Sequence, residues 1–203
     1  MEKLRDIISK GEYKRPRPER NFQAKIEPGE FAEHFILNAT AKLGYSGDAF
    51  IVDDTNKDVI NQLYYFLIGS DKFTGHLDRG VLLLGALGSG KTLIMESFVD
   101  VFNNCSGKII TKISSRNISS LIDMYMDRKP LFVDDIGKEQ TTVTNYGTVS
   151  RPFEDLINDR YKNNALTFGT SNLKLEDMPY NMHTIDRMKQ MFNVLILPGK
   201  SRR

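Results

Sequence analysis

The stretch "VLLLGALGSGKTLI", residues 81–94, runs from four apolar residues through a glycine-rich bend to a Lys-Thr pair that opens an amphipathic segment. Its central part, residues 85–92, matches the phosphate-loop pattern G-x-x-x-x-G-K-[ST] in full. The glycines of such a loop let backbone N–H groups point inward at phosphates, and the following helix places the positive end of its dipole against the same anion. The apolar run before the loop and the amphipathic stretch after it are the strand and the helix that the motif requires. We therefore expect a nucleotide to bind here through its phosphates.

Two side chains at the end of this loop are expected to make the main phosphate and metal contacts. Lys91 reaches the β- and γ-phosphates, and the Thr92 hydroxyl ligates Mg²⁺. The residues expected to bind the nucleotide in this loop are Gly85, Gly88, Ser89, Gly90, Lys91 and Thr92.

A pair of carboxylates follows another apolar run. The motif "PLFVDDIG", residues 130–137, places Asp134 and Asp135 directly after three apolar residues. At the carboxyl end of a strand, Asp134 is expected to hold Mg²⁺ through water, and Asp135 to orient or deprotonate the attacking water. The alternative is an acidic turn after a buried strand, but the complete phosphate loop upstream favours the functional interpretation.

Further polar candidates lie closer to the carboxyl terminus. The run "LTFGTSN", residues 166–172, ends in polar residues, and Asn172 is placed to touch the γ-phosphate or its water. The residues alone leave an equal alternative, a helix cap before "LKLEDM". Arg187 in "IDRMKQMF" and Arg202 or Arg203 in "GKSRR" are further candidates for the γ-phosphate. Phosphoryl transfer commonly uses an arginine supplied in cis or in trans.

After residue 80, strand-length apolar runs alternate with longer amphipathic stretches. This alternation predicts an α/β fold in which helices cover both faces of a parallel sheet. The runs are 81–85, 108–114, 131–137, 166–172 and 192–199, and the amphipathic stretches lie near 91–103, 116–127 and 151–163.

The part before residue 80 predicts helices and a linker. The segment "AFIVDD", residues 49–54, predicts a short strand, residues 1–10 an amphipathic helix, and "YKRPRPERN", residues 13–21, a basic proline-containing linker. Two more helices are predicted, one with Phe31, Phe35, Ala39 and Leu43 on its apolar face and ended by Gly44, the other capped by Asn56 and ended by Gly69.

Composition excludes several classes of protein. The 203 residues include 28 Lys and Arg against 26 Asp and Glu, so no overall charge predicts a nucleic-acid or membrane partner. A single cysteine, Cys105, excludes an internal disulfide framework, and three scattered histidines show no metal-ligand spacing. No signal-peptide core and no membrane-length apolar run is present, so we expect a cytoplasmic protein that does not contact membranes.

With these motifs in this order, the chain resembles the AAA+ ATPases of the DnaC/DnaI helicase-loader and IstB transposition-helper group. The resemblance covers roughly residues 50–203 and rests on "GALGSGKT", "LFVDDIG", "GTSNL", "IDRM" and "FNVLILPGKSRR". It implies a P-loop NTPase (AAA+) core of five parallel strands, with the strand that ends at Asn172 between the other two site strands, and no C-terminal helical lid. We expect a short helical N-terminal extension with its linker over residues 1–48 and an ATPase domain over residues 49–203.

The same resemblance implies ATP and Mg²⁺ as cofactors and gives each site residue a role. Lys91 and Thr92 would bind the nucleotide and Mg²⁺, and Asp134 and Asp135 would be the Walker B pair. An Asp-Asp pair stands where many AAA+ proteins have Asp-Glu, which predicts slow, switch-like hydrolysis. The remaining roles are Asn172 as sensor, Arg187 as the arginine finger for a neighbouring subunit's ATP, and Arg202 or Arg203 as second sensor.

The expected function is that of an ATP-hydrolysing DNA-replication protein of helicase-loader type. It would self-assemble into a homo-oligomer with ATP, bind DNA, single strands in preference to duplex, and recruit or remodel a replicative helicase. Two alternatives stay open: a transposition helper that binds duplex DNA and works with a transposase, and a P-loop nucleotide or small-molecule kinase. The candidate DNA contacts are Lys108, Lys112 and Arg116 for phosphates and Tyr146 for base stacking, with a solvated strand edge as the alternative for the lysines.

Overall fold

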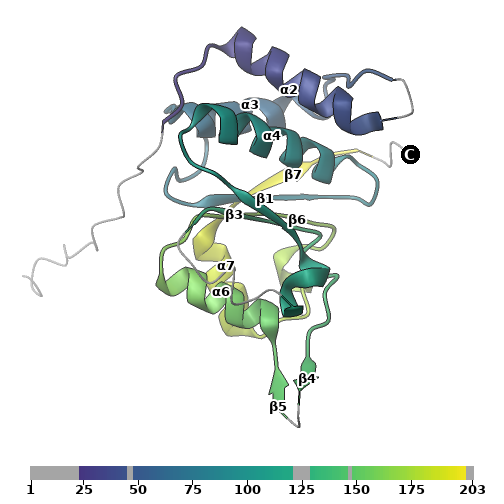
Figure 1. Cartoon of the computed structure of the whole chain (residues 1–203), viewed down its shortest axis with the longest axis vertical. Helices are drawn as coiled ribbons and strands as arrows, with labels where there is room; N and C mark the ends of the chain where they lie inside the picture. Colours follow the sequence, from purple (N-terminus) through teal and green to yellow (C-terminus); the bar gives the residue numbers. More distant parts are fainter. Residues whose placement is uncertain (1–22, 45–47, 121–128, 146–147, 200–203) are drawn as a thin grey trace, which may run out of the picture.

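The computed structural model describes residues 23–44, 48–120, 129–145 and 148–199 (Figure 1). The helix expected over residues 1–10, the linker over 13–21 and most of the amphipathic stretch 116–127 lie outside the described residues. Tyr146, Arg202 and Arg203 lie outside them as well. The described part ends at Gly199, so the expected absence of a helical lid stays a prediction. Within the described ranges, no helix combines the length and the apolar character needed to cross a membrane.

Five strands form one parallel sheet, which confirms the predicted fold class. Their spatial order is β2-β3-β6-β1-β7, and every neighbouring pair is parallel. β6 therefore lies between β1 and β3, and the carboxyl ends of all three strands meet at one edge of the sheet. The strands are β1 (Gly80–Gly85), β2 (Thr111–Ser114), β3 (Leu131–Asp134), β6 (Thr167–Ser171) and β7 (Phe192–Leu197).

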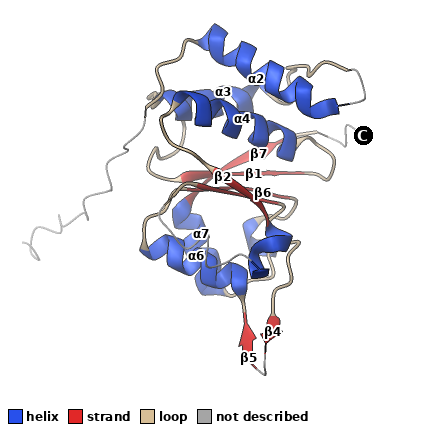
Figure 2. Ribbon diagram, in the orientation of Figure 1, coloured by secondary structure: helices blue, strands red, loops and turns tan. Residues whose placement is uncertain are grey.

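Helices cover both faces of this sheet (Figure 2). On one face lie α2 (Pro28–Leu43), α3 (Lys57–Ile68) and α4 (Lys91–Cys105), and on the other α6 (Pro152–Lys162) and α7 (Met182–Met191). Phe35 and Ala39, one turn apart on α2, are fully buried and belong to the same apolar cluster as α4 and the sheet. α2 and α3 end at Gly44 and Gly69, as predicted.

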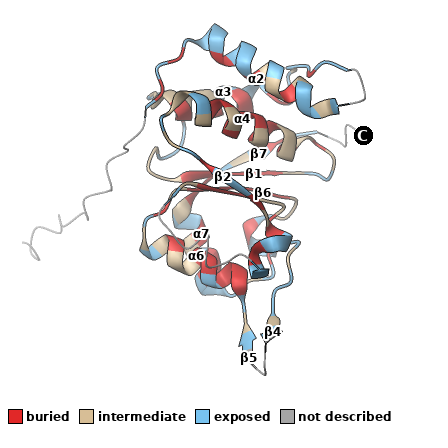
Figure 3. Cartoon of the chain, in the orientation of Figure 1, coloured by how far each residue is buried: buried red, intermediate tan, exposed pale blue. Residues whose placement is uncertain are grey.

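Aromatic side chains fill the core between the sheet and this helical layer. Phe168 of β6 packs against Phe66, Phe98 and Phe102, with ring centroids 5.7, 6.0 and 6.0 Å away. The buried residues accordingly concentrate along the sheet and the inward faces of the helices (Figure 3). This core holds the beginning of α4 against β1 and β6, whose ends form the site described below.

The predicted strand over residues 49–54 is wrong. This segment has no strand partner, its last residue begins a turn, and Phe50 packs against Phe35 of α2 with ring centroids 5.9 Å apart. Side chains satisfy its backbone instead: Phe50 N–H donates to Thr40 Oγ1 (3.0 Å), and Ile51 C=O accepts from Asn56 Nδ2 (2.9 Å). Asn56 occupies the N-cap position of α3, but its side chain supports the preceding turn rather than capping the helix.

Three further differences concern element bounds and unpredicted elements. β2 begins at Thr111 rather than Lys108, because Ile110 N–H donates to Asn103 Oδ1 (2.7 Å) instead of to a strand. An antiparallel hairpin, β4 (Val143–Asn145) and β5 (Thr148–Ser150), extends away from the sheet below α6 (Figure 1). The structure also contains α7 and the short 3-10 helix η2 (Ser115–Asn117), neither of which was predicted, and a second 3-10 helix, η3 (Leu175–Asp177), within the "LKLEDM" segment.

Gly80→Ala is expected to destabilise the protein strongly, because β1 and β6 approach too closely at this position for any side chain. A Cβ atom at Gly80 would lie 1.6 Å from the Thr167 carbonyl oxygen and 2.6 Å from the carbonyl carbon, so backbone must move. Such overpacking costs about 3 kcal/mol of unfolding free energy, measured by urea denaturation.

Gly29→Ala is the matched control, since a Cβ there would meet nothing within 4 Å and lies in the first turn of α2. It should leave stability unchanged or slightly raised. Equal stability of the two variants would contradict the β1–β6 register.

Candidate nucleotide-binding site

The carboxyl ends of β1, β3 and β6 and the beginning of α4 border one cavity of about 570 Å³. This is the edge at which parallel α/β sheets bind ligands. The end of α2 and residues 48–51 also line this cavity. It is lined by Lys42, Leu43, residues 48–51, residues 87–94, Glu96, Asp135, Lys138 and Asn172.

The phosphate loop has the backbone that its sequence predicts. Gly88 and Gly90 have φ values of 77° and 97°, in the left-handed region that favours glycine. Gly90 is the N-cap residue of α4. The first N–H groups of this helix, which have no partner within the helix, therefore lie where the loop borders the cavity. Gly85 is the last residue of β1, and the strand, loop and helix follow one another as predicted.

Lys91 is a buried cation held by neutral oxygens. Its side chain is 5% exposed, and Nζ donates to the Ala86 carbonyl oxygen (2.8 Å) and to Asn172 Oδ1 (2.6 Å). Burial lowers the pKa of the Lys91 ammonium, and the nearby Asp135 carboxylate opposes this shift. An anion bound beside Lys91 would give its ammonium a charged hydrogen-bond acceptor in place of the neutral oxygens of Ala86 and Asn172.

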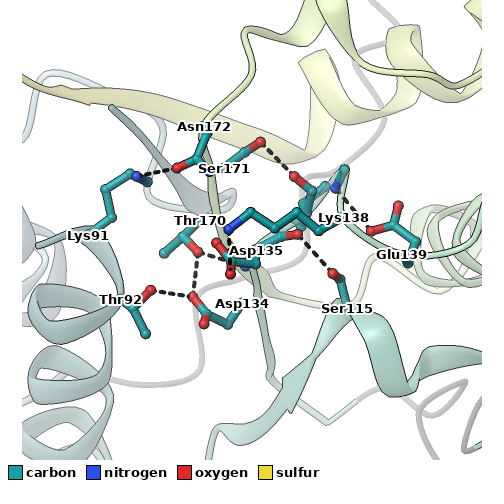
Figure 4. Close-up of polar contacts among 12 residues, drawn as sticks. Lys91, Thr92, Ser115, Asp134, Asp135, Lys138, Glu139, Thr170, Ser171 and Asn172 are labelled. Carbon is teal, nitrogen blue, oxygen red and sulfur yellow. Dashed lines mark hydrogen bonds and ion pairs between the residues drawn. The ribbon is translucent and has the colours of Figure 1, made fainter. Parts of the chain in front are cut away.

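The two residues expected to ligate Mg²⁺ lie together (Figure 4). Thr92 Oγ1 donates to Asp134 Oδ1 at 2.9 Å, although the residues are 42 positions apart in the chain. Thr170 Oγ1 donates to the same Asp134 oxygen (2.6 Å) and accepts from the Asp135 N–H (2.9 Å). Thr170 thus orients both aspartates, a role that the sequence analysis missed. The available signal was a polar residue within a buried strand.

Asp135 follows β3 in a strained backbone conformation, with φ 60° for a residue that is not glycine. Its backbone is held from both sides, since its N–H donates to Thr170 and its carbonyl accepts from Ser115 Oγ (2.8 Å). Its carboxylate Oδ2 pairs with Lys138 Nζ at 2.8 Å. Lys138 belongs to no motif in the sequence; the available signal was a lysine three positions after a site aspartate.

The turn after Asp135 is tied to neighbouring elements by further hydrogen bonds. Ser171 Oγ donates to the Ile136 carbonyl oxygen (2.6 Å), and Glu139 Oε2 accepts from the Gly137 N–H (3.0 Å). The other Glu139 oxygen accepts from the Tyr180 hydroxyl, and burial together with the Glu139 charge raises the pKa of Tyr180. The site therefore has a fixed wall on the side of β6 and the segment that precedes α7.

Asn172 lines the cavity and contacts Lys91, whereas the N-cap position of η3 is occupied by Lys174. Arg187 does not line the cavity. It lies on α7, half-buried, where it donates to Asn158 Oδ1 and lies 5.3 Å from the ring centroid of Tyr161. The structure therefore brings Lys91, Thr92, both aspartates and Asn172 together, but not Arg187.

The three basic residues considered for DNA contact differ in their surroundings. Lys112 pairs with Asp100, which also pairs with Lys42 at 2.7 Å. Lys108 is half-buried, and Arg116 is exposed.

The residues present fit a nucleotide phosphate and Mg²⁺. Thr92 and Asp134 offer the hydroxyl and carboxylate oxygens that Mg²⁺ prefers. Ser89 Oγ is buried in the phosphate loop and has no hydrogen-bond partner among the described residues. Together with Lys91, whose hydrogen-bond acceptors are neutral oxygens, this hydroxyl offers a donor and a positive charge that suit a phosphate.

No protein-family model and no curated protein matches the chain. Among solved structures, DnaI is similar over 89% of this chain and 96% of its own, with 18% identity and a TM-score of 0.58. The DnaC helicase loader is similar over 73% of this chain and 93% of its own, with 16% identity and a TM-score of 0.55.

The replication initiator DnaA, solved with AMPPCP and single-stranded DNA, is similar over 74% of this chain and 49% of its own, with 16% identity and a TM-score of 0.53. At these identities the likeness concerns the fold. The expected resemblance to the DnaC/DnaI group is thereby confirmed as a shared α/β P-loop NTPase architecture.

Proposed function

We propose that this chain is an ATP-binding and ATP-hydrolysing protein of helicase-loader type that acts in DNA replication. The observation that carries the proposal is the convergence of Lys91, Thr92, Asp134 and Asn172 at the ends of three adjacent parallel strands. The fold shared with DnaI and the DnaC helicase loader supports the replication role.

Each residue of the phosphate loop has a role in binding ATP. The backbone N–H groups of residues 85–92 surround the phosphates, and Lys91 turns from Asn172 to the β- and γ-phosphates. Thr92 and Asp134 would hold Mg²⁺, which would supply positive charge to neutralise the phosphates. Residues 48–51 line the same cavity and are the part of it that we assign to the nucleoside.

Hydrolysis requires a base for the attacking water. The water oxygen forms a bond to the γ-phosphorus while the bond from this phosphorus to the ADP oxygen breaks, and Asp135 accepts the water proton. Asn172, which follows the neighbouring strand β6, orients the water or the γ-phosphate. Because the Asp135 side chain is shorter than that of glutamate and is paired with Lys138, we propose slow, switch-like turnover.

Arg187 acts on the ATP of a neighbouring subunit. This role is supported by its place on α7, outside the cavity of its own chain. It requires self-assembly into a homo-oligomer with ATP, and Arg202 or Arg203 would add a second charge near the phosphates. We further propose single-stranded DNA and a replicative helicase as partners of the assembled form.

The deciding experiment is steady-state ATP hydrolysis without DNA, with single-stranded DNA and with duplex DNA. Single strands are expected to raise the rate, because an assembled array lets Arg187 of one subunit reach the nucleotide of the next. The blank is Lys91→Ala, which removes the phosphate-binding ammonium.

Stimulation by duplex DNA alone would favour a transposition helper instead. A hydrolysing protein that responds to neither DNA would contradict the DNA role, and phosphoryl transfer to a small-molecule acceptor would identify a kinase.

A further inference from the structure

Lys138 lines the nucleotide cavity but belongs to none of the motifs found in the sequence. It is the third residue after Asp135, and its ammonium pairs with the carboxylate that the proposed function needs as a base. The contact is close, 2.8 Å between Lys138 Nζ and Asp135 Oδ2. A base neutralised in this way must be released before it can accept a proton from water.

The two members of this pair differ in mobility. The Asp135 backbone is fixed by hydrogen bonds to Thr170 and Ser115, so its carboxylate has little freedom. The Lys138 N–H donates to the Asp135 carbonyl oxygen (3.1 Å), and its side chain, 30% exposed, is held by the pair with the Asp135 carboxylate. A four-carbon stem can swing its ammonium over several ångströms. Lys138 is therefore the partner that moves.

The Lys138 side chain reaches toward the phosphate-binding side of the cavity. In Figure 4 it runs from its backbone across Asp135 toward the side on which Lys91 and Thr92 lie. It lines the same cavity as Lys91 and Asn172, and its charge contributes to the lowered pKa of Lys91. Two ammonium groups thus face the end of the cavity beside the aspartates, where the last phosphate of a triphosphate would lie.

Charge decides which partner Lys138 prefers. A partly exposed ion pair with one carboxylate is weak, whereas a terminal phosphate carries more negative charge and more acceptor oxygens. A diphosphate bound through the loop ends one phosphate short of this position and leaves the Asp135–Lys138 pair intact.

We propose that Lys138 is a γ-phosphate-binding residue that distinguishes ATP from ADP, and that its transfer to the γ-phosphate frees Asp135 to act as the base. The proposal rests on the proposed ATPase function and adds to it a sensing residue within the same chain. Binding of ATP, but not of ADP, then frees Asp135 to act as the base. After loss of the γ-phosphate, Lys138 pairs with Asp135 again.

The test compares the affinities for ADP and for the non-hydrolysable analogue AMPPCP, both with Mg²⁺, by titration calorimetry. Lys138→Met keeps the length of the side chain and removes its charge. It is expected to weaken AMPPCP binding about 10-fold, the scale of one charge-assisted hydrogen bond, and to leave ADP binding within about twofold. Lys138→Arg should keep the preference for the triphosphate, and Lys162→Met, an exposed lysine of α6, is the matched control.

The outcomes separate this inference from the function on which it rests. If Lys138→Met binds AMPPCP as tightly as the unaltered protein, or weakens both nucleotides equally, Lys138 does not read the γ-phosphate and the inference is wrong while the ATPase function stands. If the unaltered protein binds neither nucleotide, the proposed function itself fails. Circular dichroism of Lys138→Met checks that the fold is kept.

Discussion

Lys91→Met is expected to weaken ATP binding by about 100-fold or more, since a buried ammonium that contacts phosphate contributes about 3 kcal/mol. The reason lies in the present surroundings of Lys91, which is 5% exposed and donates hydrogen bonds to neutral oxygens of Ala86 and Asn172. Nothing else in the loop can supply the lost charge at this depth. Titration with ATP and Mg²⁺ measures the effect.

The same substitution is expected to leave the nucleotide-free protein as stable as before, or more stable by about 1 kcal/mol. Burial lowers the pKa of Lys91, which means that the folded chain pays for holding the charged form. Methionine keeps the volume and removes that cost. Thermal unfolding with and without ATP should therefore show stabilisation by ATP in the unaltered protein and in the exposed control Lys162→Met, and none in Lys91→Met. ATP-dependent stabilisation of Lys91→Met would contradict the phosphate-binding role.

Arg187→Ala is expected to lower hydrolysis about 1000-fold, the typical effect of removing an arginine finger, while ATP binding stays unchanged. Binding is preserved because Arg187 does not line the cavity of its own chain. The loss of its contacts with Asn158 and the Tyr161 ring costs about 1 kcal/mol of stability at most. Asn158→Ala is the control, because it removes the contact but keeps the arginine, and it should retain most of the activity.

Mixing two inactive variants tests whether the arginine acts between subunits. Lys91→Met binds ATP too weakly to hydrolyse it but keeps Arg187, and Arg187→Ala binds ATP but lacks the arginine. In a mixed assembly some nucleotide sites are completed by a neighbour, so hydrolysis should return. Normal hydrolysis by Arg187→Ala alone would exclude the finger role, and a mixture without activity would exclude action between subunits.

Local sequence was enough to predict the elements that bind phosphate and the overall fold class. Glycines that tolerate left-handed φ, at Gly88 and Gly90, and the apolar runs on either side carry their information within a few residues. Buried parallel strands read as continuous apolar runs, and helices show their period in residues such as Phe31 and Phe35. The position of β6 between β1 and β3 was predicted from the family resemblance. The length and composition of the apolar runs do not encode which strands are neighbours.

The remaining features depend on contacts between distant parts of the chain. The segment 49–54 has the composition of a strand, yet its backbone forms hydrogen bonds with the side chains of Thr40 and Asn56. No sequence period distinguishes a strand that pairs with a sheet from a segment that side chains hold in this way. Thr170 can orient Asp134 and Asp135 only because β6 lies beside β3. The Lys138–Asp135 pair likewise requires the tight left-handed turn at Asp135. The sequence by itself therefore determines which residues can bind phosphate and Mg²⁺. Which side chains orient or neutralise these residues depends on strand order and turn geometry, because side chains interact only where the backbone brings them within a few ångströms.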